Sequence, residues 1–304
     1  MENKISELIN QVKLKNWRSL AKAITIVENE LGGFEDILKS VDFRIKTPVI
    51  GITGPPGAGK STIVNSLIEE LLKIPTNTIG ILAIDPTSPF NFGSVLGDRV
   101  RMAQHFNNER VYIRSIATRG SLGGLSGKTI EISDVMQLAR FSHILIETVG
   151  VGQSEVEIVG LADATILVLV PEAGDEVQTI KSGIMEIADI FVVNKSDRNG
   201  ANTFVNNLAH LVHKKHGENY STQIVKTVAT KNEGIGELNS AITKHLSFEF
   251  RNSKKTFLLA EKAFELIRNK LMKGINKNEL LERIEKEQKN HDFNLYAFVN
   301  NYTI

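Results

Sequence analysis

The sequence predicts an α/β fold, in which a doubly wound and mostly parallel sheet carries helical extensions at both ends. Two observations predict it. Between residues 47 and 248, short runs rich in Val, Ile and Leu alternate with segments of helical periodicity. Strands that are buried on both faces, as in a parallel sheet covered by helices, need such continuous apolar runs. The first run also leads directly into a glycine-rich turn and an amphipathic helix.

Residues 1–46 are expected to form a helical layer ahead of the sheet. Apolar residues recur there at the helical period in two stretches, and this spacing predicts two short helices. The residues are Ile5, Leu8, Ile9 and Val12, followed by Leu20, Ala23, Ile24 and Val27.

The central domain, residues 47–248, contains the predicted strands. We expect them at 49–53, 79–85, 110–115, 142–148, 164–170, 190–194 and 223–229. Helical patterns separate these runs, which is typical of consecutive strand–helix–strand units and a parallel sheet.

The last segment, residues 249–304, has a wholly helical pattern. Five apolar residues lie on one side of its first predicted helix, and the stretch KNELLERIEKEQKN follows. They are Phe257, Ala260, Phe264, Ile267 and Leu271. We expect a helical arm, which would suit a homodimer.

Composition restricts the possible partners and location. Lys and Arg number 36 against 35 Asp and Glu, so the formal net charge of +1 favours neither a nucleic acid nor an anionic membrane as partner. Cysteine is absent, which excludes disulfides, thiolate metal sites and cysteine nucleophiles. No apolar run approaches the roughly 20 residues of a membrane span. We expect a cytoplasmic protein with a small-molecule or protein partner.

The glycine-rich turn fits a phosphate-binding loop. The stretch GPPGAGKS at 54–61 matches G-x-x-x-x-G-K-S/T between a strand and a helix, the context that this motif requires. Its glycines let backbone N–H groups approach phosphates, and its prolines stiffen the loop. Lys60 is expected to reach the β- and γ-phosphate oxygens, and the Ser61 hydroxyl to ligate Mg²⁺. The expected phosphate-binding residues are Gly54, Pro55, Pro56, Gly57, Ala58, Gly59, Lys60, Ser61 and Thr62.

A second motif indicates which base is bound. Asn194, Lys195 and Asp197 reproduce N-K-x-D at the end of a predicted strand. The Asp197 carboxylate would accept hydrogen bonds from two N–H groups of guanine, a pair that adenine lacks, so GTP or GDP is favoured over ATP. In the stretch VATKNEGIGEL, the residues 228–230 (Val228, Ala229, Thr230) would complete the base pocket, with the Ala229 N–H facing the guanine oxygen.

Acidic residues at other strand ends are candidates for sensing the terminal phosphate. Glu147 ends a predicted strand and Gly150 begins the following loop, where a backbone amide could bond the γ-phosphate. Asp85 and Asp98 lie between the second and third strands, where a Mg²⁺-coordinating switch would sit. Each aspartate could instead cap a helix, and Glu147 could be a carboxylate beside a flexible turn. The candidate catalytic residues are Lys60, Asp85 and Glu147, and the candidate Mg²⁺ ligands are Ser61, Asp85, Asp98 and Glu147.

Four longer stretches carry a more specific resemblance. The stretches ILAIDPTSPFNFGSVLGDRVRM, TRGSLGGLS, IETVGVGQSE and EAGDEVQTIKSGIMEIADIFVVNKSD together resemble the MeaB/ArgK family of GTPases. The resemblance runs from Ser19 to about residue 238. It implies a signal-recognition-like P-loop GTPase fold with an N-terminal helical layer and a C-terminal dimerising arm. It also implies a G-protein chaperone that gates adenosylcobalamin delivery to an acyl-CoA mutase, chiefly methylmalonyl-CoA mutase, and protects it.

The resemblance also assigns a further segment, and the chain departs from the family pattern there. EAGDEV at 172–177 matches an additional switch through which relatives communicate with the mutase. Glu172 follows Pro171 where relatives usually have Pro-Gly, so a flexible residue is replaced by a charge. Val228 stands where serine is commoner, although a backbone contact from Ala229 would survive this change.

The predicted reaction is in-line attack of water on the γ-phosphate, with slow turnover unless a partner orders the switches. Gln153 is one candidate for positioning the water, and the start of a helix is its other interpretation. Three alternatives remain: a kinase associated with arginine/ornithine (LAO/AO) transport, a nickel-insertion GTPase, and a non-catalytic module that uses GTP to fix its shape. His210, His213 and His216 could bind a metal, but a solvated basic face is favoured beside Lys214 and Lys215.

Overall fold

The computed structural model describes most of the chain in two compact units, Met1–Asn252 and Ser253–Ile304. The described residues are 2–42, 44, 47–85, 102–117, 127–148, 158–174, 188–216, 223–247 and 260–302, the last range without 261, 262, 265, 269, 273 and 290–292. The two units are considered separately.

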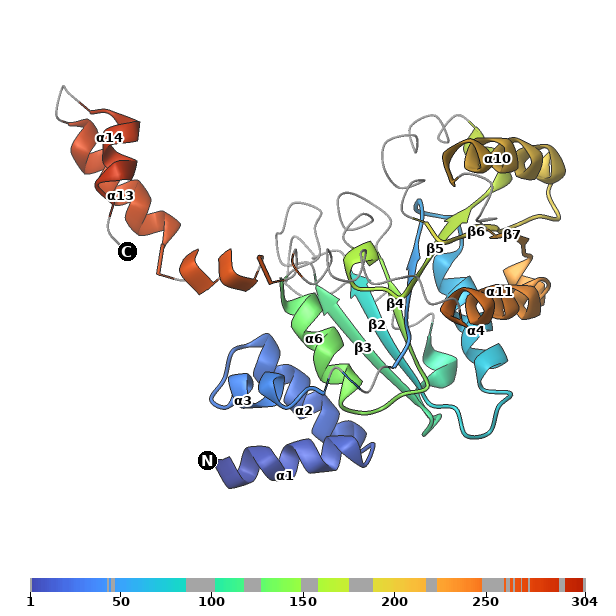
Figure 1. Ribbon diagram of the computed structural model, residues 1–304, viewed down its shortest axis with the longest axis horizontal. Coiled ribbons are helices and arrows are strands. Elements are labelled where there is room, and N and C mark those ends of the chain that lie inside the picture. Colours follow the sequence, from blue (N-terminus) through green and yellow to red (C-terminus); the bar gives the residue numbers. More distant parts are fainter. Residues whose placement is uncertain are drawn as a thin grey trace. The chain divides into compact units, whose positions relative to one another are not determined.

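A seven-stranded sheet forms the centre of the first unit (Figure 1). Its strands are β1 (Val49–Thr53), β2 (Ile79–Asp85), β3 (Val111–Ala117), β4 (His143–Glu147), β5 (Ala164–Leu169), β6 (Ile190–Val193) and β7 (Gln223–Lys226). Their order is β3-β2-β4-β1-β5-β6-β7, and every neighbouring pair is parallel. The predicted α/β class with a parallel sheet is confirmed.

The last predicted strand ends earlier than expected. Residues 223–229 were expected to be extended, but β7 ends at Lys226 and a 3₁₀ turn, η4, spans Ala229–Lys231. The backbone of Val228 pairs with Glu233 instead of with β6, through N···O distances of 3.0 and 3.3 Å in the two directions. The chain therefore leaves the sheet at this point, and Ala229 packs into the core cluster beneath helices α4 (Lys60–Leu71) and α11 (Ile235–Ser247).

Helices cover both faces of the sheet, as its apolar strands require. These helices are α4 (Lys60–Leu71), α6 (Gly127–Gln137), α10 (Ala201–His216) and α11 (Ile235–Ser247). Helices α4 and α11 pack on one face, and α6 and α10 pack on the other (Figure 1).

Strand β6 shows why the apolar runs are continuous. Ile190 and Val192 belong to the core cluster beneath α4 and α11, whereas Phe191 and Val193 belong to the cluster beneath α10. All four side chains are fully buried. Successive residues of a strand point to opposite faces, so a strand covered on both sides needs an apolar residue at every position.

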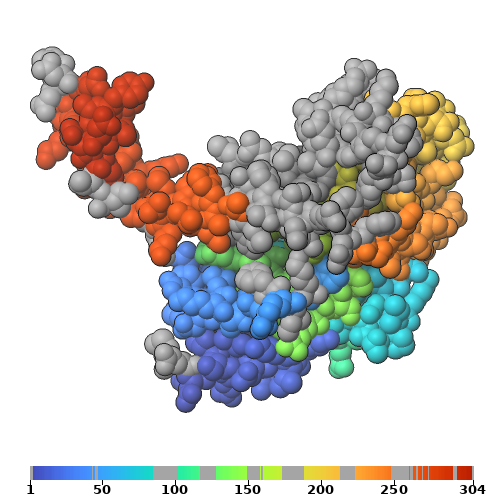
Figure 2. Space-filling model, in the orientation of Figure 1, coloured from blue at the N-terminus to red at the C-terminus, as the bar shows by residue number. Residues whose placement is uncertain are grey.

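Among the described N-terminal residues, three helices, not the two expected, form the layer on α6. They are α1 (Glu2–Lys13), α2 (Trp17–Glu28) and α3 (Phe34–Lys39). Figure 2 shows these N-terminal residues, in blue, packed directly against the rest of the unit. Helix α3 has six residues and buries Ile37 fully, so it is too short to show a helical period in the sequence.

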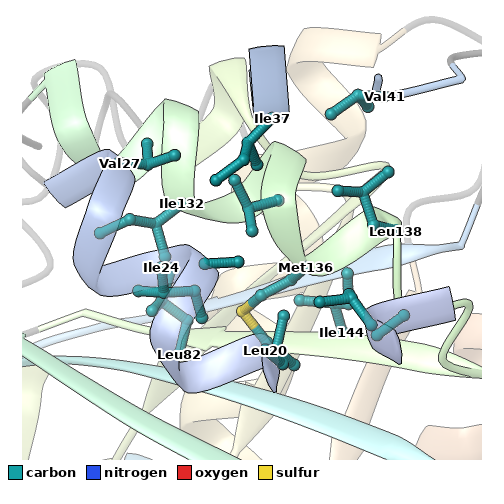
Figure 3. Close-up of a cluster of buried hydrophobic side chains, with 14 of the residues drawn as sticks. Leu20, Ile24, Val27, Ile37, Val41, Leu82, Ile132, Met136, Leu138 and Ile144 are labelled. Atoms are coloured by element: carbon teal, nitrogen blue, oxygen red, sulfur yellow. The ribbon is translucent and has the colours of Figure 1, made fainter. Parts of the chain in front are cut away.

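The N-terminal layer shares one core with the sheet. Leu20, Ile24 and Val27 of α2 point toward Ile132 and Met136 of α6 (Figure 3). The same cluster continues to the strand residues below α6. The layer therefore belongs to the packing of the first unit.

An aromatic group fixes the start of α2. The Trp17 ring stacks on Phe141 with centroids 5.1 Å apart and lies 5.8 Å from Tyr112 on β3. The Trp17 Nε1–H also donates a hydrogen bond to the Glu109 carbonyl oxygen at 2.7 Å. The contact with Tyr112 and the hydrogen bond to Glu109, two residues before β3, join the helical layer to the edge strand of the sheet.

The second unit is helical in the residues described. It contains α13 (Lys277–Gln288) and α14 (Leu295–Asn300), after helical residues between 260 and 272. Phe264, Ile267 and Leu271 are each more than half exposed. Among the described residues of both units, no helix is long and apolar enough to cross a membrane.

Candidate functional site

The candidate site lies where the carboxyl ends of the central strands meet. The glycine-rich loop follows β1, which lies between β4 and β5. Because all strands are parallel, β1, β4 and β6 have their carboxyl ends on the same side of the sheet. Ligands of open α/β sheets bind outside the carboxyl ends of the strands, at the point where successive strands begin to be added on the opposite side of the first strand.

The loop has a backbone shape that requires glycine. Gly54, Gly57 and Gly59 have φ of +141°, +77° and +93°. A Cβ atom at Gly54 would lie 2.2 Å from the Val168 carbonyl oxygen, and one at Gly59 would lie 2.4 Å from Asn194 Nδ2. Helix α4 begins directly after Gly59, so its N-terminal N–H groups border the loop. Such an arrangement is suited to binding phosphate.

Lys60 places a buried cation against this loop. Its side chain is buried, and its Nζ donates to the carbonyl oxygens of Gly54 at 2.8 Å and Pro55 at 3.1 Å. The ammonium group adds to the positive end of the α4 dipole. The remaining predicted loop residues, Pro56, Ala58 and Thr62, lie in the same loop and in the first turn of α4. Contact between Lys60 and phosphate oxygens stays a prediction.

Ser61 and Glu147 form a buried, hydrogen-bonded pair of oxygen-bearing side chains. The Ser61 hydroxyl donates to Glu147 Oε1 at 2.6 Å, and both residues are less than a tenth exposed. The pairing of β1 with β4 sets Glu147 opposite Ile52, at the base of the loop. A hydroxyl and a carboxylate are the kind of hard oxygen ligand that Mg²⁺ prefers. The pair therefore fits a magnesium ion.

Asn194 joins the phosphate loop to the second predicted loop. Its Nδ2 donates to the Ala58 carbonyl oxygen at 2.9 Å, and its Oδ1 accepts from Thr227 Oγ1 at 3.1 Å. The same Oδ1 accepts from the Ala229 N–H at 3.2 Å, although we expected that N–H to face a guanine oxygen. The Asn194 amide, which is 3% exposed, therefore ties two loops together.

Lys195 and Asp197 differ in their surroundings. Lys195, in the left-handed region with φ of +55°, donates from Nζ to the Gly57 carbonyl oxygen at 2.8 Å. Asp197 Oδ2 lies 3.4 Å from Lys231 Nζ, and its side chain is 45% exposed. The Asp197 carboxylate is thus partly open to solvent.

The loop after β7 makes its hydrogen bonds to α4 and to Asn194 through the backbone atoms of Ala229. Val228 and Ala229 are buried and Thr230 is exposed. The Ser66 hydroxyl of α4 donates to the Ala229 carbonyl oxygen at 2.9 Å. Ser66 and Thr227 could not be identified from the sequence, because neither belongs to a motif. Thr227 lies inside the strand expected at 223–229, where nothing in the sequence distinguishes it.

Several of the predicted site residues cannot be compared with the structure, because it does not describe them or their side chains. Asp98, Gly150 and Gln153 fall outside the described residues, and for Asp85 the structure places only the backbone, at the end of β2. The side chains of His213 and His216 are not described either. Within the described part of the chain, no group of three or more His, Asp or Glu side chains is arranged to hold a metal ion.

Comparison with known proteins places this site in a family. The family model for methylmalonyl-CoA mutase-associated GTPase MeaB matches residues 20–289. A putative GTPase of Pyrococcus abyssi is 48% identical over 255 residues, which cover 82% of this chain and 78% of that protein. The GTPase ArgK of Escherichia coli is 33% identical over 256 residues, or 79% and 76% of the two chains.

A solved structure shows the same fold. The crystal structure of a LAO/AO transport system kinase superposes with a TM-score of 0.67 at 23% identity, over 99% of this chain and 96% of that one. At this identity the likeness concerns the fold alone. The family model and the sequence relatives go further, and they confirm the resemblance: the chain belongs to the MeaB family of P-loop GTPases.

Proposed function

We propose that this GTPase is a nucleotide-gated chaperone for a cobalamin-dependent acyl-CoA mutase, and that methylmalonyl-CoA mutase is the favoured partner. It would bind GTP with Mg²⁺, hydrolyse it to GDP and phosphate, and gate adenosylcobalamin delivery while protecting the mutase. The family description, which names methylmalonyl-CoA mutase, supports the partner. We further propose a cytoplasmic homodimer that uses the helical second unit as its dimerising arm.

One observation carries the nucleotide assignment, the bridge that Asn194 makes between two loops. Its amide binds the phosphate loop at Ala58 and the turn after β7 at Thr227. Asp197 follows three residues later, in the turn that this bridge ties to the phosphate loop. A ligand with a polyphosphate and a base that donates two hydrogen bonds would satisfy both loops together.

The chain's own residues supply the groups that phosphoryl transfer to water needs. The backbone N–H groups at the start of α4 and the Lys60 ammonium would stabilise charge on the phosphate oxygens. Glu147 would fix the orientation of the Ser61 hydroxyl, because it accepts a hydrogen bond from that hydroxyl. A magnesium ion at this pair would neutralise part of the phosphate charge. We expect slow intrinsic turnover.

The sharpest test of the base assignment is Asp197→Asn. Xanthine carries a carbonyl oxygen where guanine carries its exocyclic amino group, so an amide that donates there suits XTP and a carboxylate suits GTP. We expect the variant to lose at least about 100-fold in GTP affinity, because a lost charge-assisted pair is worth about 3 kcal/mol, and to gain XTP affinity. Titration calorimetry with GTP, XTP and ATP measures both changes.

Equal GTP affinity in wild type and variant would contradict guanine recognition by Asp197. Wild-type protein that binds ATP as tightly as GTP would overturn the assignment as a whole. Ser196→Ala is the matched control. Ser196 precedes Asp197 in the sequence, but its hydroxyl donates to the Thr227 carbonyl oxygen of the protein and is not proposed to contact the base.

Two assays separate the chaperone from its alternatives. With γ-labelled GTP, a hydrolase releases all label as free phosphate, whereas a kinase leaves part of it on arginine, ornithine or protein. Capture of purified methylmalonyl-CoA mutase by immobilised protein should depend on whether GTP or GDP is bound. Binding that is the same with and without nucleotide would count against nucleotide gating.

A further inference from the structure

An ion pair joins the loops that follow two adjacent strands. Glu172 lies in the 3₁₀ turn η3 (Pro171–Gly174) after β5, and its Oε1 accepts from Nη1 of Arg198 in the turn after β6. Arg198 is the residue directly after Asp197, and its N–H donates to the Lys195 carbonyl oxygen at 3.0 Å. The pair therefore reaches from η3 to the turn that carries the base-recognition carboxylate.

The charges around Glu172 favour its ionised form. The hydrogen bond from Arg198 is the main cause that lowers the pKa of the Glu172 carboxyl, and the charges of Arg198 and Lys195 add to it. Lys195 in turn donates to the Gly57 carbonyl oxygen. A continuous series of polar contacts thus runs from η3 through the base-recognition turn to the phosphate loop.

We propose that Glu172 is a positioning residue for guanine-nucleotide binding. It holds Arg198, and through Arg198 it orients the turn that presents Asp197 to the base. This inference rests on the proposed function and adds a residue to its site. A glycine at this position, which has no side chain, could not make the contact.

The effect is expected to be small and dependent on salt. Both side chains are about half exposed, and an exposed ion pair changes an equilibrium by about two- to five-fold. Screening weakens such a pair at high ionic strength, where the Debye length falls to about 3 Å at 1 M salt. A positioning role therefore predicts a loss of affinity that salt removes.

The test measures GDP affinity in a double-mutant cycle. We expect Glu172→Gln and Arg198→Gln each to raise the Kd for GDP by about two- to five-fold at low salt, with no further loss in the double variant. The charge-exchanged double variant, Glu172→Arg with Arg198→Glu, should recover most of the affinity. Glu35→Gln is the matched control, because Glu35 pairs with Lys39 at 3.2 Å on the exposed face of α3. It should leave the Kd unchanged.

Each outcome decides between the inference and the proposed function. A Kd for Glu172→Gln equal to that of wild type at low salt, or additive losses in the double variant, overturns the inference. A lowered melting temperature with an unchanged Kd also overturns it, because the pair would then be structural only. If Asp197→Asn loses GDP while Glu172→Gln does not, the inference falls and the proposed function stands. Wild-type protein that takes up no guanine nucleotide overturns the proposed function itself.

Discussion

The three loop glycines share a positive φ but differ in what surrounds them. A side chain at Gly54 would meet backbone atoms of β5, which cannot move without disturbing the sheet. A side chain at Gly57 would meet nothing within 4 Å. Substitution by alanine therefore tests backbone strain alone at Gly57, and strain together with a steric clash at Gly54.

We predict that Gly54→Ala destabilises the first unit by more than about 3 kcal/mol, because strain and overpacking add. Gly57→Ala, with φ of +77°, should cost only the strain of a left-handed alanine, about 1–2 kcal/mol. Urea unfolding of the two variants measures both. Equal losses would show that the contact with Val168 can relax.

At this scale the sequence predicted residues but not their pairings. The glycine pattern, Lys60 and Asp197 could be named as candidates because each belongs to a motif with a chemical reason. The bond between Ser61 and Glu147 joins residues 86 positions apart, and that between Asn194 and Ala58 joins residues 136 apart. Such contacts depend on strand order, which no local pattern contains.

Between elements, the Asn194 amide is the main connection in the site. Its donor and its acceptor have different partners, so two substitutions can separate them. Asn194→Asp keeps an acceptor for Thr227 and Ala229 but sets an oxygen against the Ala58 carbonyl oxygen. Thr227→Val removes one donor and keeps the shape of the side chain.

We predict that Asn194→Asp costs at least about 3 kcal/mol, since it buries a charge and leaves the Ala58 carbonyl unpaired. Thr227→Val should cost about 1 kcal/mol, the value of one neutral hydrogen bond. Chemical unfolding gives both values, and GDP titration should rank the variants in the same order. A larger loss for Thr227→Val would place the main connection elsewhere.

Strands were predicted more accurately than the ends of elements. Burial on both faces leaves an apolar run that the sequence shows directly, as in β1 and β5. The end of β7 was missed because Val228 is apolar yet pairs outside the sheet. Helix α3 was missed because one buried residue cannot define a period.

For the first unit as a whole, the N-terminal layer and the sheet share a core. Leu20 of α2 is fully buried in the same cluster as Leu82 of β2 and Ile144 of β4. Leu14, close by in the sequence, is 74% exposed. The layer and the sheet should therefore unfold together.

We predict that Leu20→Ala lowers the free energy of unfolding by about 2–5 kcal/mol, the cost of a cavity in a packed core. Leu14→Ala, the control, should change it by less than about 0.5 kcal/mol. Both variants should show one cooperative transition when circular dichroism is followed during urea unfolding. An earlier, separate transition in Leu20→Ala would show that the layer folds independently of the sheet.

The sequence indicated the parallel sheet and the helical segments around it, but not the arrangement of the strands. The position of β1 between β4 and β5 follows from how each connecting helix crosses the sheet. That choice depends on packing across the whole unit, which becomes visible only once the helices are placed on their faces.

The ring of Trp17 has a practical consequence, because it is the chain's single tryptophan. Its contacts with Phe141 and with the Glu109 carbonyl exist only while α2 lies against the edge of the sheet. The protein thus contains an intrinsic fluorophore whose emission reports docking of the N-terminal helices without any attached dye. Nucleotide exchange can then be followed with a labelled ligand while the integrity of the scaffold is monitored in the same cuvette.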